Sequence, residues 1–305
     1  MAPKLNVGLR VPAVHPTNVE ALKAFVQRAE ALGFHSIWVG DHVFYHLDVP
    51  QPLNLLTWIA ALTTRVRLGT AVMLGAYLDP VTLARQAATL DCLSGGRLTL
   101  GLSIGGTEAE YRSLGVPMKQ RVGRLMESAD LIRRLWSEDD VAFEGRYFQV
   151  EHGNLRPKPA QKPGPPLYFG AFQEPMLRRI AARADGWIAG GGTIDSFIDG
   201  VALVRRLAQE KGRDPDGLGF AKLHGVSVHR SRAEALTRAK SHWQAYYGPK
   251  YDVETSTIVG TPAECAAKLA AFTAVDAPEV TLALEPSSLD LDQLELLFET
   301  TRGLA

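Results

Sequence analysis

Residues 33–46, GFHSIWVGDHVFYH, decide the fold prediction and mark a candidate site. Within them, the run Ser36-Ile37-Trp38-Val39 is apolar or β-prone throughout and directly follows a helix-ending glycine. Such a run is typical of a parallel strand that is buried on both faces. Gly40 ends the strand, and a carboxylate and an imidazole, Asp41 and His42, come next. Ligands bind beyond the carboxyl ends of strands in parallel α/β folds, so these two side chains are candidate functional residues.

The rest of the chain repeats the alternation of strand and helix. Asp79-Pro80 predicts a helix start, with Asp79 as N-cap, and Thr17/Glu20 and Thr261/Glu264 fit capping boxes. Eight strands are predicted, at residues 5–11, 36–39, 66–72, 98–102, 166–169, 186–189, 220–228 and 279–284. Repeated βα units predict a parallel sheet, and eight of them favour a closed (β/α)8 TIM barrel with insertions at its carboxyl face. A doubly wound open sheet remains the alternative.

Composition limits the function. The chain has 305 residues, 46% of them hydrophobic, which fits one barrel domain over residues 1–305. Basic and acidic residues balance at 33 each, so no nucleic-acid or membrane partner is expected. The sequence has only two cysteines, and its start does not look like a signal peptide. No apolar run approaches the ~18 residues of a membrane span. We therefore expect a cytoplasmic protein without a membrane span.

His42 is the candidate catalytic residue, because an imidazole transfers protons near neutral pH. A structural histidine bonded to a neighbouring carbonyl is the alternative. A metal site would need His42 and His46, four residues apart, to share a helix face. Gly40 and Pro50 predict a loop instead, so we expect no metal.

Three glycine-rich loops follow predicted strands and could hold a ligand. The first lets the backbone approach a flat or anionic molecule, and the other two lead into helices whose free amides could bind phosphate. No GxGxxG or P-loop pattern is present, which argues against a Rossmann or NTPase fold. The loops are Ser103-Ile104-Gly105-Gly106, Gly170-Ala171-Phe172-Gln173-Glu174-Pro175 and Gly190-Gly191-Gly192-Thr193.

Six segments, in order along nearly the whole chain, resemble the bacterial luciferase-like monooxygenase superfamily of flavin- or deazaflavin-dependent barrel enzymes. They are GFHSIWVGDH (33–42), RLGTAV (67–72), LSGGRLTLGL (93–102), EYRSLGVP (110–117), RADGW (183–187) and VGTPAE (259–264).

The resemblance implies that FMN or coenzyme F420 binds at the carboxyl face of the barrel. The ring would lie over the third strand, where a non-prolyl cis peptide maps onto Ala71–Val72, and the phosphate would lie on the loops that begin at Gly170 and Gly190. His42 would be catalytic. The residues implied to bind the coenzyme are Asp41, Thr70, Ala71, Val72, Ser103, Gly105, Gly170, Ala171, Phe172, Gln173, Gly190, Gly191, Gly192 and Thr193.

The Asp-His pair and the LGVP segment are more similar to the deazaflavin branch than to the light-emitting luciferases. Two positions depart from family patterns. Gly106 stands where sugar-phosphate dehydrogenases carry a glutamate, and Ile104 where luciferases carry a phosphate-binding arginine. We therefore favour hydride transfer between F420 and a small organic substrate. The alternatives are an FMN-dependent monooxygenase that inserts oxygen and a non-catalytic flavin-binding protein.

The substrate and partners are less determined by the sequence. Loops 44–54 and 247–258 are expected to shape the pocket. Their aromatic residues either form an apolar or aromatic cavity or only pack its rim; with Tyr77, they are Phe44, Tyr45, Tyr247 and Tyr251. The resemblance also implies a homodimer and a reductase that supplies reduced coenzyme.

Overall fold

The computed structural model describes residues 2–13 and 18–304, and its strands close into a parallel barrel. Each barrel strand pairs in parallel with its neighbour, and the last pairs back with the first, Leu5 lying opposite Val280. In ring order the strands are β1 (Lys4–Arg10), β2 (Ser36–Val39), β3 (Arg67–Thr70), β5 (Leu98–Ser103), β8 (Leu167–Gly170), β9 (Gly186–Ala189), β10 (Gly219–Val228) and β12 (Glu279–Pro286). This closure confirms the TIM barrel and rules out the open sheet.

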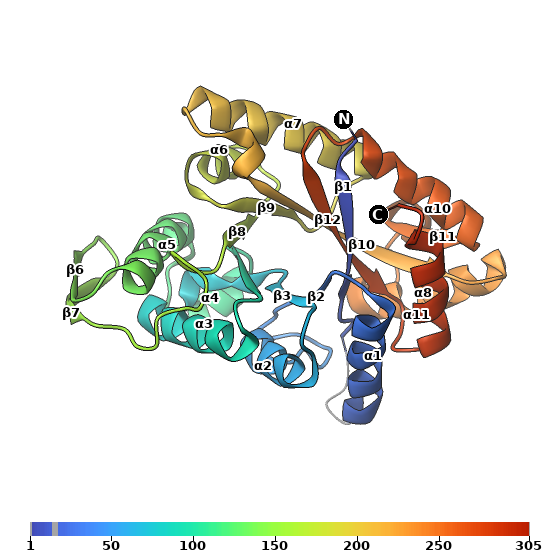
Figure 1. Cartoon of the computed structure of the whole chain (residues 1–305), viewed down its shortest axis with the longest axis horizontal. Helices are drawn as coiled ribbons and strands as arrows, with labels where there is room; N and C mark the ends of the chain where they lie inside the picture. The colour runs from blue at the N-terminus through green and yellow to red at the C-terminus, as the bar shows by residue number, and fades with distance from the viewer. Residues whose placement is uncertain (1, 14–17, 305) are drawn as a thin grey trace.

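Helices surround the strands on all sides (Figure 1). The longer ones are α1 (Val19–Leu32), α2 (Pro52–Leu62), α3 (Pro80–Ser94), α5 (Arg121–Ser137), α6 (Glu174–Arg183), α7 (Ile194–Glu210), α8 (Arg232–Tyr247), α10 (Pro262–Ala270) and α11 (Leu291–Thr301). As predicted, Asp79 caps α3 and accepts from Thr82 N at 2.7 Å, and Thr261 and Glu264 form a capping box. The Thr17/Glu20 prediction falls partly outside the described residues, since Thr17 is not among them. None of the described helices has both the length and the apolar character that crossing a membrane would require.

Some segments differ from the sequence prediction. The third strand was expected to run to residue 72, but it ends at Thr70 and the chain resumes as β4 (Met73–Leu74) beside β5. Loop 247–258 contains the short helix α9 (Val253–Ser256) and leads directly into an unexpected strand, β11 (Thr257–Gly260). β11 pairs with the end of β10 outside the barrel. β11 follows directly on α9 with no loop between them, and its place is set by pairing with β10, which lies well before it in the sequence.

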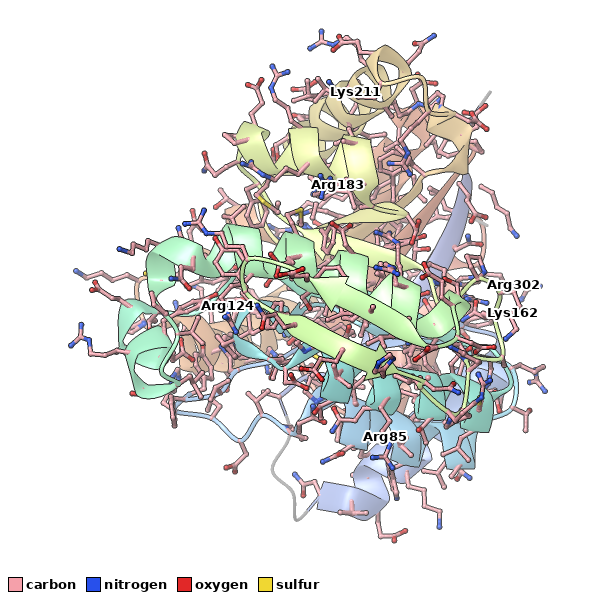
Figure 2. All side chains as sticks on the ribbon, turned by 90° about the vertical axis from the view of Figure 1, so that its left-hand side faces the viewer. Arg85, Arg124, Lys162, Arg183, Lys211 and Arg302 are labelled. Carbon is pink, nitrogen blue, oxygen red and sulfur yellow. The ribbon has the colours of Figure 1, made fainter. Side chains whose placement is uncertain are left out.

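The predicted hairpin is present as β6 (Val141–Glu144) and β7 (Gln149–Gly153), which pair antiparallel outside the barrel. It lies at the edge of the molecule beside α5 (Figure 1). The guanidinium of Arg124, on α5, stacks 4.7 Å from the centroid of the Phe148 ring. Figure 2 views the molecule from this side and shows the hairpin in front, with charged side chains pointing outward around it.

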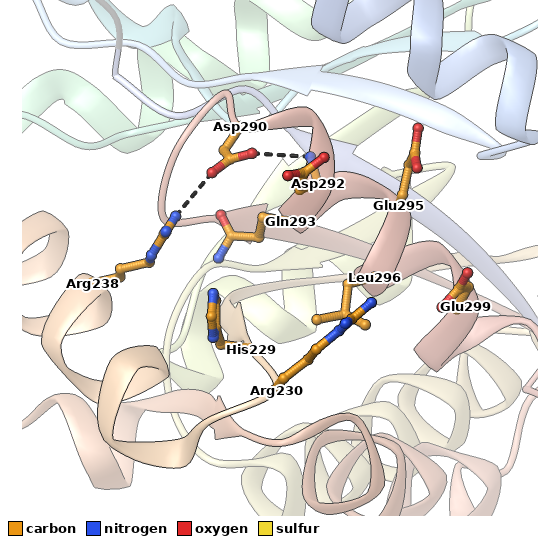
Figure 3. Close-up of a pocket in the computed structure, with 9 residues that line it drawn as sticks. All are labelled: His229, Arg230, Arg238, Asp290, Asp292, Gln293, Glu295, Leu296 and Glu299. Atoms are coloured by element: carbon orange, nitrogen blue, oxygen red, sulfur yellow. Dashed lines mark hydrogen bonds and ion pairs between the residues drawn. The ribbon is translucent and has the colours of Figure 1, made fainter.

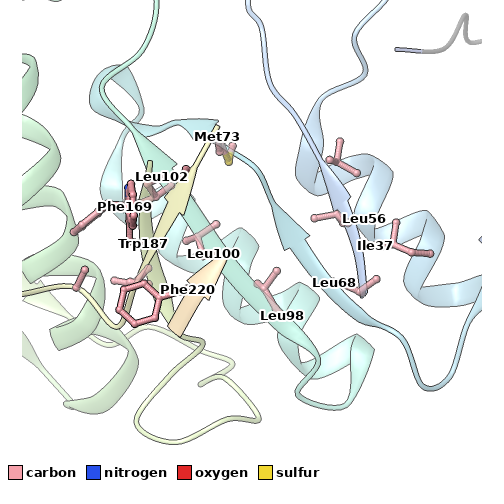
Figure 4. Packing of buried hydrophobic residues seen from close by; sticks show 14 of the residues in the cluster. Ile37, Leu56, Leu68, Met73, Leu98, Leu100, Leu102, Phe169, Trp187 and Phe220 are labelled. Atoms are coloured by element: carbon pink, nitrogen blue, oxygen red, sulfur yellow. The ribbon is translucent and has the colours of Figure 1, made fainter. Parts of the chain in front are cut away.

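Apolar side chains fill the space on both sides of the barrel wall. Outside the barrel, Leu98, Leu100 and Leu102 follow one another along β5 and pack with Phe169 and Trp187 (Figure 4). Inside it, a separate cluster is made of Trp38, Ala71, Ile188, Ala221 and Ala283. The Trp38 ring fits only because residue 69 is glycine, since a Cβ there would lie 2.2 Å from the ring. The barrel interior is therefore filled at this level, and within the barrel the space for a ligand lies above this cluster, at the carboxyl face.

Candidate active site

A cavity of about 650 Å³ opens among the loops that follow the barrel strands. This volume is typical of small-molecule sites. It brings together residues that are far apart in the sequence, including most of those predicted from it. The predicted residues that line the cavity are Asp41, His42, Ala71, Val72, Ser103, Gly105, Phe172, Gly190, Gly191, Gly192 and Thr193.

Four residues from the predicted set, Thr70, Gly170, Ala171 and Gln173, are not among those that line the cavity. Thr70 is fully buried, and its hydroxyl donates to Gly101 O at 2.7 Å. Gly170 leaves room for Val72, because a Cβ at Gly170 would lie 2.9 Å from a methyl group of that valine. Ala171 O accepts from the Trp187 indole at 2.9 Å, and Gln173 precedes the first turn of α6.

The chain between β3 and β4 forms the floor of the cavity. The peptide bond between Ala71 and Val72 is cis, as the resemblance implied. Asp41 Oδ2 accepts a hydrogen bond from Leu74 N at 2.9 Å, so the carboxylate holds the segment that follows this bond. Burial raises the pKa of Asp41, and the Leu74 amide opposes that effect. Asp41 thus anchors the floor of the site.

His42 is held by two aromatic residues. Its Nε2 lies 2.9 Å from the hydroxyl oxygen of Tyr246. The Tyr45 ring stacks on the imidazole, with centroids 4.0 Å apart and planes 11° from parallel. Burial, and then the charge of Arg10, lower the pKa of His42. The ring is therefore uncharged near neutral pH and can exchange a proton with a bound molecule.

Next to His42 lies a buried charge network that the sequence analysis missed. Arg10 and Glu285 form an ion pair whose side chains are 12% and 4% exposed. The second carboxylate oxygen of Glu285 lies 3.2 Å from His242 Nε2, and Arg10 Nη2 lies 3.4 Å from the Tyr246 hydroxyl. Arg10 and Glu285 stand at the carboxyl ends of predicted strands, so the criterion that selected Asp41 would have found them. Nothing in the sequence indicated the two residues on α8.

The loop between β9 and α7 has the form of an anion site. A Cβ at Gly190 or Gly191 would meet no atom closer than 3.4 Å, so a side chain there would make only ordinary van der Waals contacts, with Phe172 and Leu223. Thr193 caps the 17-residue α7 by accepting from Ser196 N at 3.2 Å. Lys222 is fully buried, and its ammonium donates to the carbonyls of Gly191 and Gly192 at 2.6 and 3.1 Å. With these carbonyls held by Lys222, the loop amides and the helix N-terminus remain available to a phosphate.

No group of three or more His, Cys, Asp or Glu side chains that could hold a metal ion occurs among residues 2–13 and 18–304. His46, which was weighed as a ligand partner of His42, places its Nε2 2.8 Å from Ala245 O. The His42–His46 pair therefore does not converge on a common point.

A second cavity, of about 390 Å³, lies between the start of α8 and α11 (Figure 3). Its central charges are paired: Arg238 donates to Asp290 at 2.9 Å, and Asp290 also accepts from Asp292 N at 2.9 Å. It contains none of the predicted site residues. The larger cavity, with its buried titratable groups, is therefore the candidate active site.

Two buried histidines beside the cavity predict how stability changes with pH. Burial lowers the pKa of His224 to about 3 and that of His242 to about 4. In the unfolded chain both have an ordinary pKa near 6.5, so the unfolded chain binds more protons in the pH window between these values. We expect the free energy of unfolding to fall as the pH is lowered from 7 to about 4, measured by urea denaturation. His224→Gln should reduce this slope, whereas the same change at the exposed His152 should not. A profile unaffected by His224→Gln would contradict this account.

Comparisons with known proteins agree with this geometry. The family model described as "Luciferase-like monooxygenase" matches residues 6–254. An F420-dependent glucose-6-phosphate dehydrogenase from Amycolatopsis mediterranei is 34% identical over 250 residues, which cover 77% of this chain and 73% of that protein. A protein of the same name from Kineococcus radiotolerans is 37% identical over 180 residues, 56% of this chain but only 52% of that relative's length.

Among solved structures, the monooxygenase RslO1 from Streptomyces bottropensis superposes with a TM-score of 0.86 at 22% identity. The alignment covers 98% of this chain and 99% of that chain, which supports the barrel fold along the whole sequence. The extent of the family match is decisive: the chain belongs to the luciferase-like monooxygenase family and is an enzyme of this oxidoreductase family.

Proposed function

We propose that this protein transfers a hydride between the deazaflavin coenzyme F420 and a small organic substrate. The observation that carries the proposal is that one cavity joins an uncharged histidine, His42, to a glycine loop at a helix N-terminus, Gly190–Gly192. The relatives named F420-dependent dehydrogenases, at 34% and 37% identity, support this choice of coenzyme.

The residues present fit such a coenzyme. Gly191 and Gly192, with Thr193 and the start of α7, would hold its phosphate. The ring would lie against Ala71 and Val72, beside Gly105, where a Cβ would lie 2.7 Å from a methyl group of Leu74. When bound, a deazaflavin supplies a carbon that accepts or donates hydride and reacts little with oxygen.

His42 would move the proton that accompanies the hydride. In the reducing direction the imidazole N–H would give the substrate oxygen or nitrogen the proton that accompanies the hydride, and in the oxidising direction the imidazole would take that proton back. Burial keeps the ring uncharged, and the Tyr45 and Tyr246 contacts fix its place.

Two departures from family patterns shape the proposal. Gly106 has a φ of +99°, so its turn favours glycine at the position of the acid in sugar-phosphate dehydrogenases. Glu110 does not replace that acid, because its carboxylate accepts from Thr107 N at 2.6 Å and Phe44 N at 3.3 Å. At the position of the luciferase arginine, Ile104 packs against the apolar core. We therefore propose a substrate other than a sugar phosphate.

FMN-dependent oxygen insertion is the second candidate, because the matching family is described as monooxygenases. The two candidate functions are distinguished by titrating the purified protein with F420 and with FMN and following absorbance and fluorescence. We expect F420 to bind more tightly than FMN. Preference for FMN would overturn the proposal in favour of a monooxygenase, and binding of neither would remove the coenzyme assignment.

A charged residue in the glycine loop should weaken coenzyme binding. Gly191→Asp would place a carboxylate where we propose the phosphate, and repulsion should raise the F420 dissociation constant at least about tenfold. Isothermal titration measures the change. The matched control is Gly303→Asp near the carboxyl terminus, where a Cβ would meet nothing within 4 Å, and it should leave the affinity unchanged. Equal affinities for both variants would place the phosphate elsewhere.

A further inference from the structure

We propose that Tyr246 is a positioning residue for His42. In this arrangement the Tyr246 hydroxyl accepts a hydrogen bond from Arg10 and donates one to Nε2 of His42. The uncharged imidazole must then carry its own proton on Nδ1. The link to catalysis rests on the proposed function, in which His42 exchanges a proton with the substrate. The hydrogen-bond directions do not depend on it.

The chain of hydrogen bonds begins at Glu285. Its side chain is 4% exposed, and its carboxylate binds Arg10 through one oxygen and His242, at 3.2 Å, through the other. This pairing fixes the Arg10 guanidinium under the cavity. Gly40 makes room for it, because a Cβ there would lie 2.2 Å from Arg10 Nη2. Arg10 is thus held in one place by two independent constraints.

The direction of the next bond follows from the chemistry of the guanidinium. An arginine side chain has N–H donors and no acceptor, so across the 3.4 Å between Arg10 Nη2 and Tyr246 Oη the phenol oxygen accepts. The single proton of the phenol is then left for another partner. Among the described residues, His42 Nε2 at 2.9 Å is the acceptor within hydrogen-bond distance of this hydroxyl.

The opposite direction leaves a polar group unpaired. If His42 donated from Nε2, the Tyr246 oxygen would accept from both Arg10 and His42, and its own proton would have no protein acceptor among the described residues. Tyr246 is 2% exposed, and leaving a buried donor unpaired is costly. The arrangement in which Tyr246 donates to His42 is therefore favoured.

The His42 ring is also prevented from rotating freely. Tyr45 stacks on it and donates its hydroxyl proton to the backbone carbonyl of Tyr246, so both aromatic residues are tied together around the imidazole. Among the residues described, no hydrogen bond reaches His42 Nδ1, and His42 lines the cavity. Nδ1–H is thus the group left to donate a hydrogen bond or a proton to a ligand.

Charged groups on three elements surround this histidine. Arg10 at the end of β1 and His46 in the same loop lower the pKa of His42 after burial, and Glu110 on α4 (Glu108–Ser113) raises it. A hydrogen bond from Tyr246 to Nε2 stabilises only the uncharged ring. Removing that hydroxyl should therefore raise the pKa of His42.

The test is ¹⁵N NMR of histidine-labelled protein without coenzyme or substrate. We expect His42 of the natural protein to show the Nδ1–H tautomer. In Tyr246→Phe, which keeps the ring and removes the hydroxyl, we expect a mixture of tautomers and a raised pKa. The control is Tyr251→Phe, which removes a hydroxyl from the same cavity without touching His42 and should leave the tautomer unchanged. Thermal unfolding of both variants checks that each is folded.

Activity supplies an independent reading. With coenzyme and a turnover substrate, Tyr246→Phe should lower kcat by roughly 10- to 100-fold with little change in KM, and shift the pH profile upward. An Nε2–H tautomer in the natural protein, or identical spectra for Tyr246→Phe and the natural protein, would overturn the positioning role. If the spectra change as expected but F420 does not bind, the proposed function fails and the positioning role stands.

Discussion

Replacing His42 with alanine is expected to reduce kcat by roughly 10²- to 10⁴-fold, the usual contribution of a positioned general acid or base. Coenzyme affinity should be nearly unchanged, because the proposed phosphate contacts come from a different loop, Gly190–Gly192, which follows β9. The two readouts are steady-state turnover and the F420 dissociation constant, measured on the same preparation. Added imidazole should restore part of the lost activity.

The matched control is His46→Ala, which removes a second imidazole from the same loop. His46 bonds to a backbone carbonyl on α8 and is exposed, so turnover should change only a few-fold. Equal losses in the two variants would mean that the loop is disturbed as a whole. Unchanged turnover in His42→Ala would remove His42 from the reaction.

The largest effect on stability is expected at Glu285. Glu285→Ala would leave the Arg10 guanidinium, with a side chain only 12% exposed, buried without its carboxylate. Breaking a buried pair on one side costs about 3–5 kcal/mol of unfolding free energy. Urea denaturation monitored by circular dichroism measures the loss. The double variant Arg10→Met/Glu285→Leu should recover much of it, because both charges are then removed.

An exposed ion pair supplies the comparison. Arg28 and Glu295 join α1 to α11 with side chains 43% and 45% exposed. Solvent-exposed pairs contribute about 0–1 kcal/mol, so Glu295→Ala should change the free energy of unfolding by less than about 1 kcal/mol. Similar losses of unfolding free energy in Glu285→Ala and Glu295→Ala would contradict the view that burial makes the Arg10–Glu285 pair important.

Much of the barrel could be predicted because its strands and helices carry local signals. The strand Ser36–Val39 was bounded by glycines, and α3 by Asp79-Pro80 and Gly95-Gly96. Each of these signals lies within a few neighbouring residues, so it can be recognised without knowledge of the fold. β11 had no such boundary at its start, because Thr257 follows directly on α9. Its place is set by pairing with β10, which is a contact between distant segments.

The site was predictable only in part, for the same reason. Asp41 and His42 follow a clear strand end, and the glycine loops carry their own signal. Tyr246 and His242 lie one turn apart on α8, where the sequence reads as an ordinary helix face. Their importance comes from what lies opposite, His42 and Glu285, about two hundred and about forty residues away along the chain. Contacts of this kind appear only once the barrel closes.

The Trp38 cluster inside the barrel bears on the order of events during turnover. Since side chains from five barrel segments fill the space beneath the cavity, the cavity has a solid floor and molecules come and go at the carboxyl face. Two molecules that share it must pass through the same mouth. We expect the molecule held deeper to arrive first and depart last, so that the barrel would impose a loading sequence on two ligands that share the cavity.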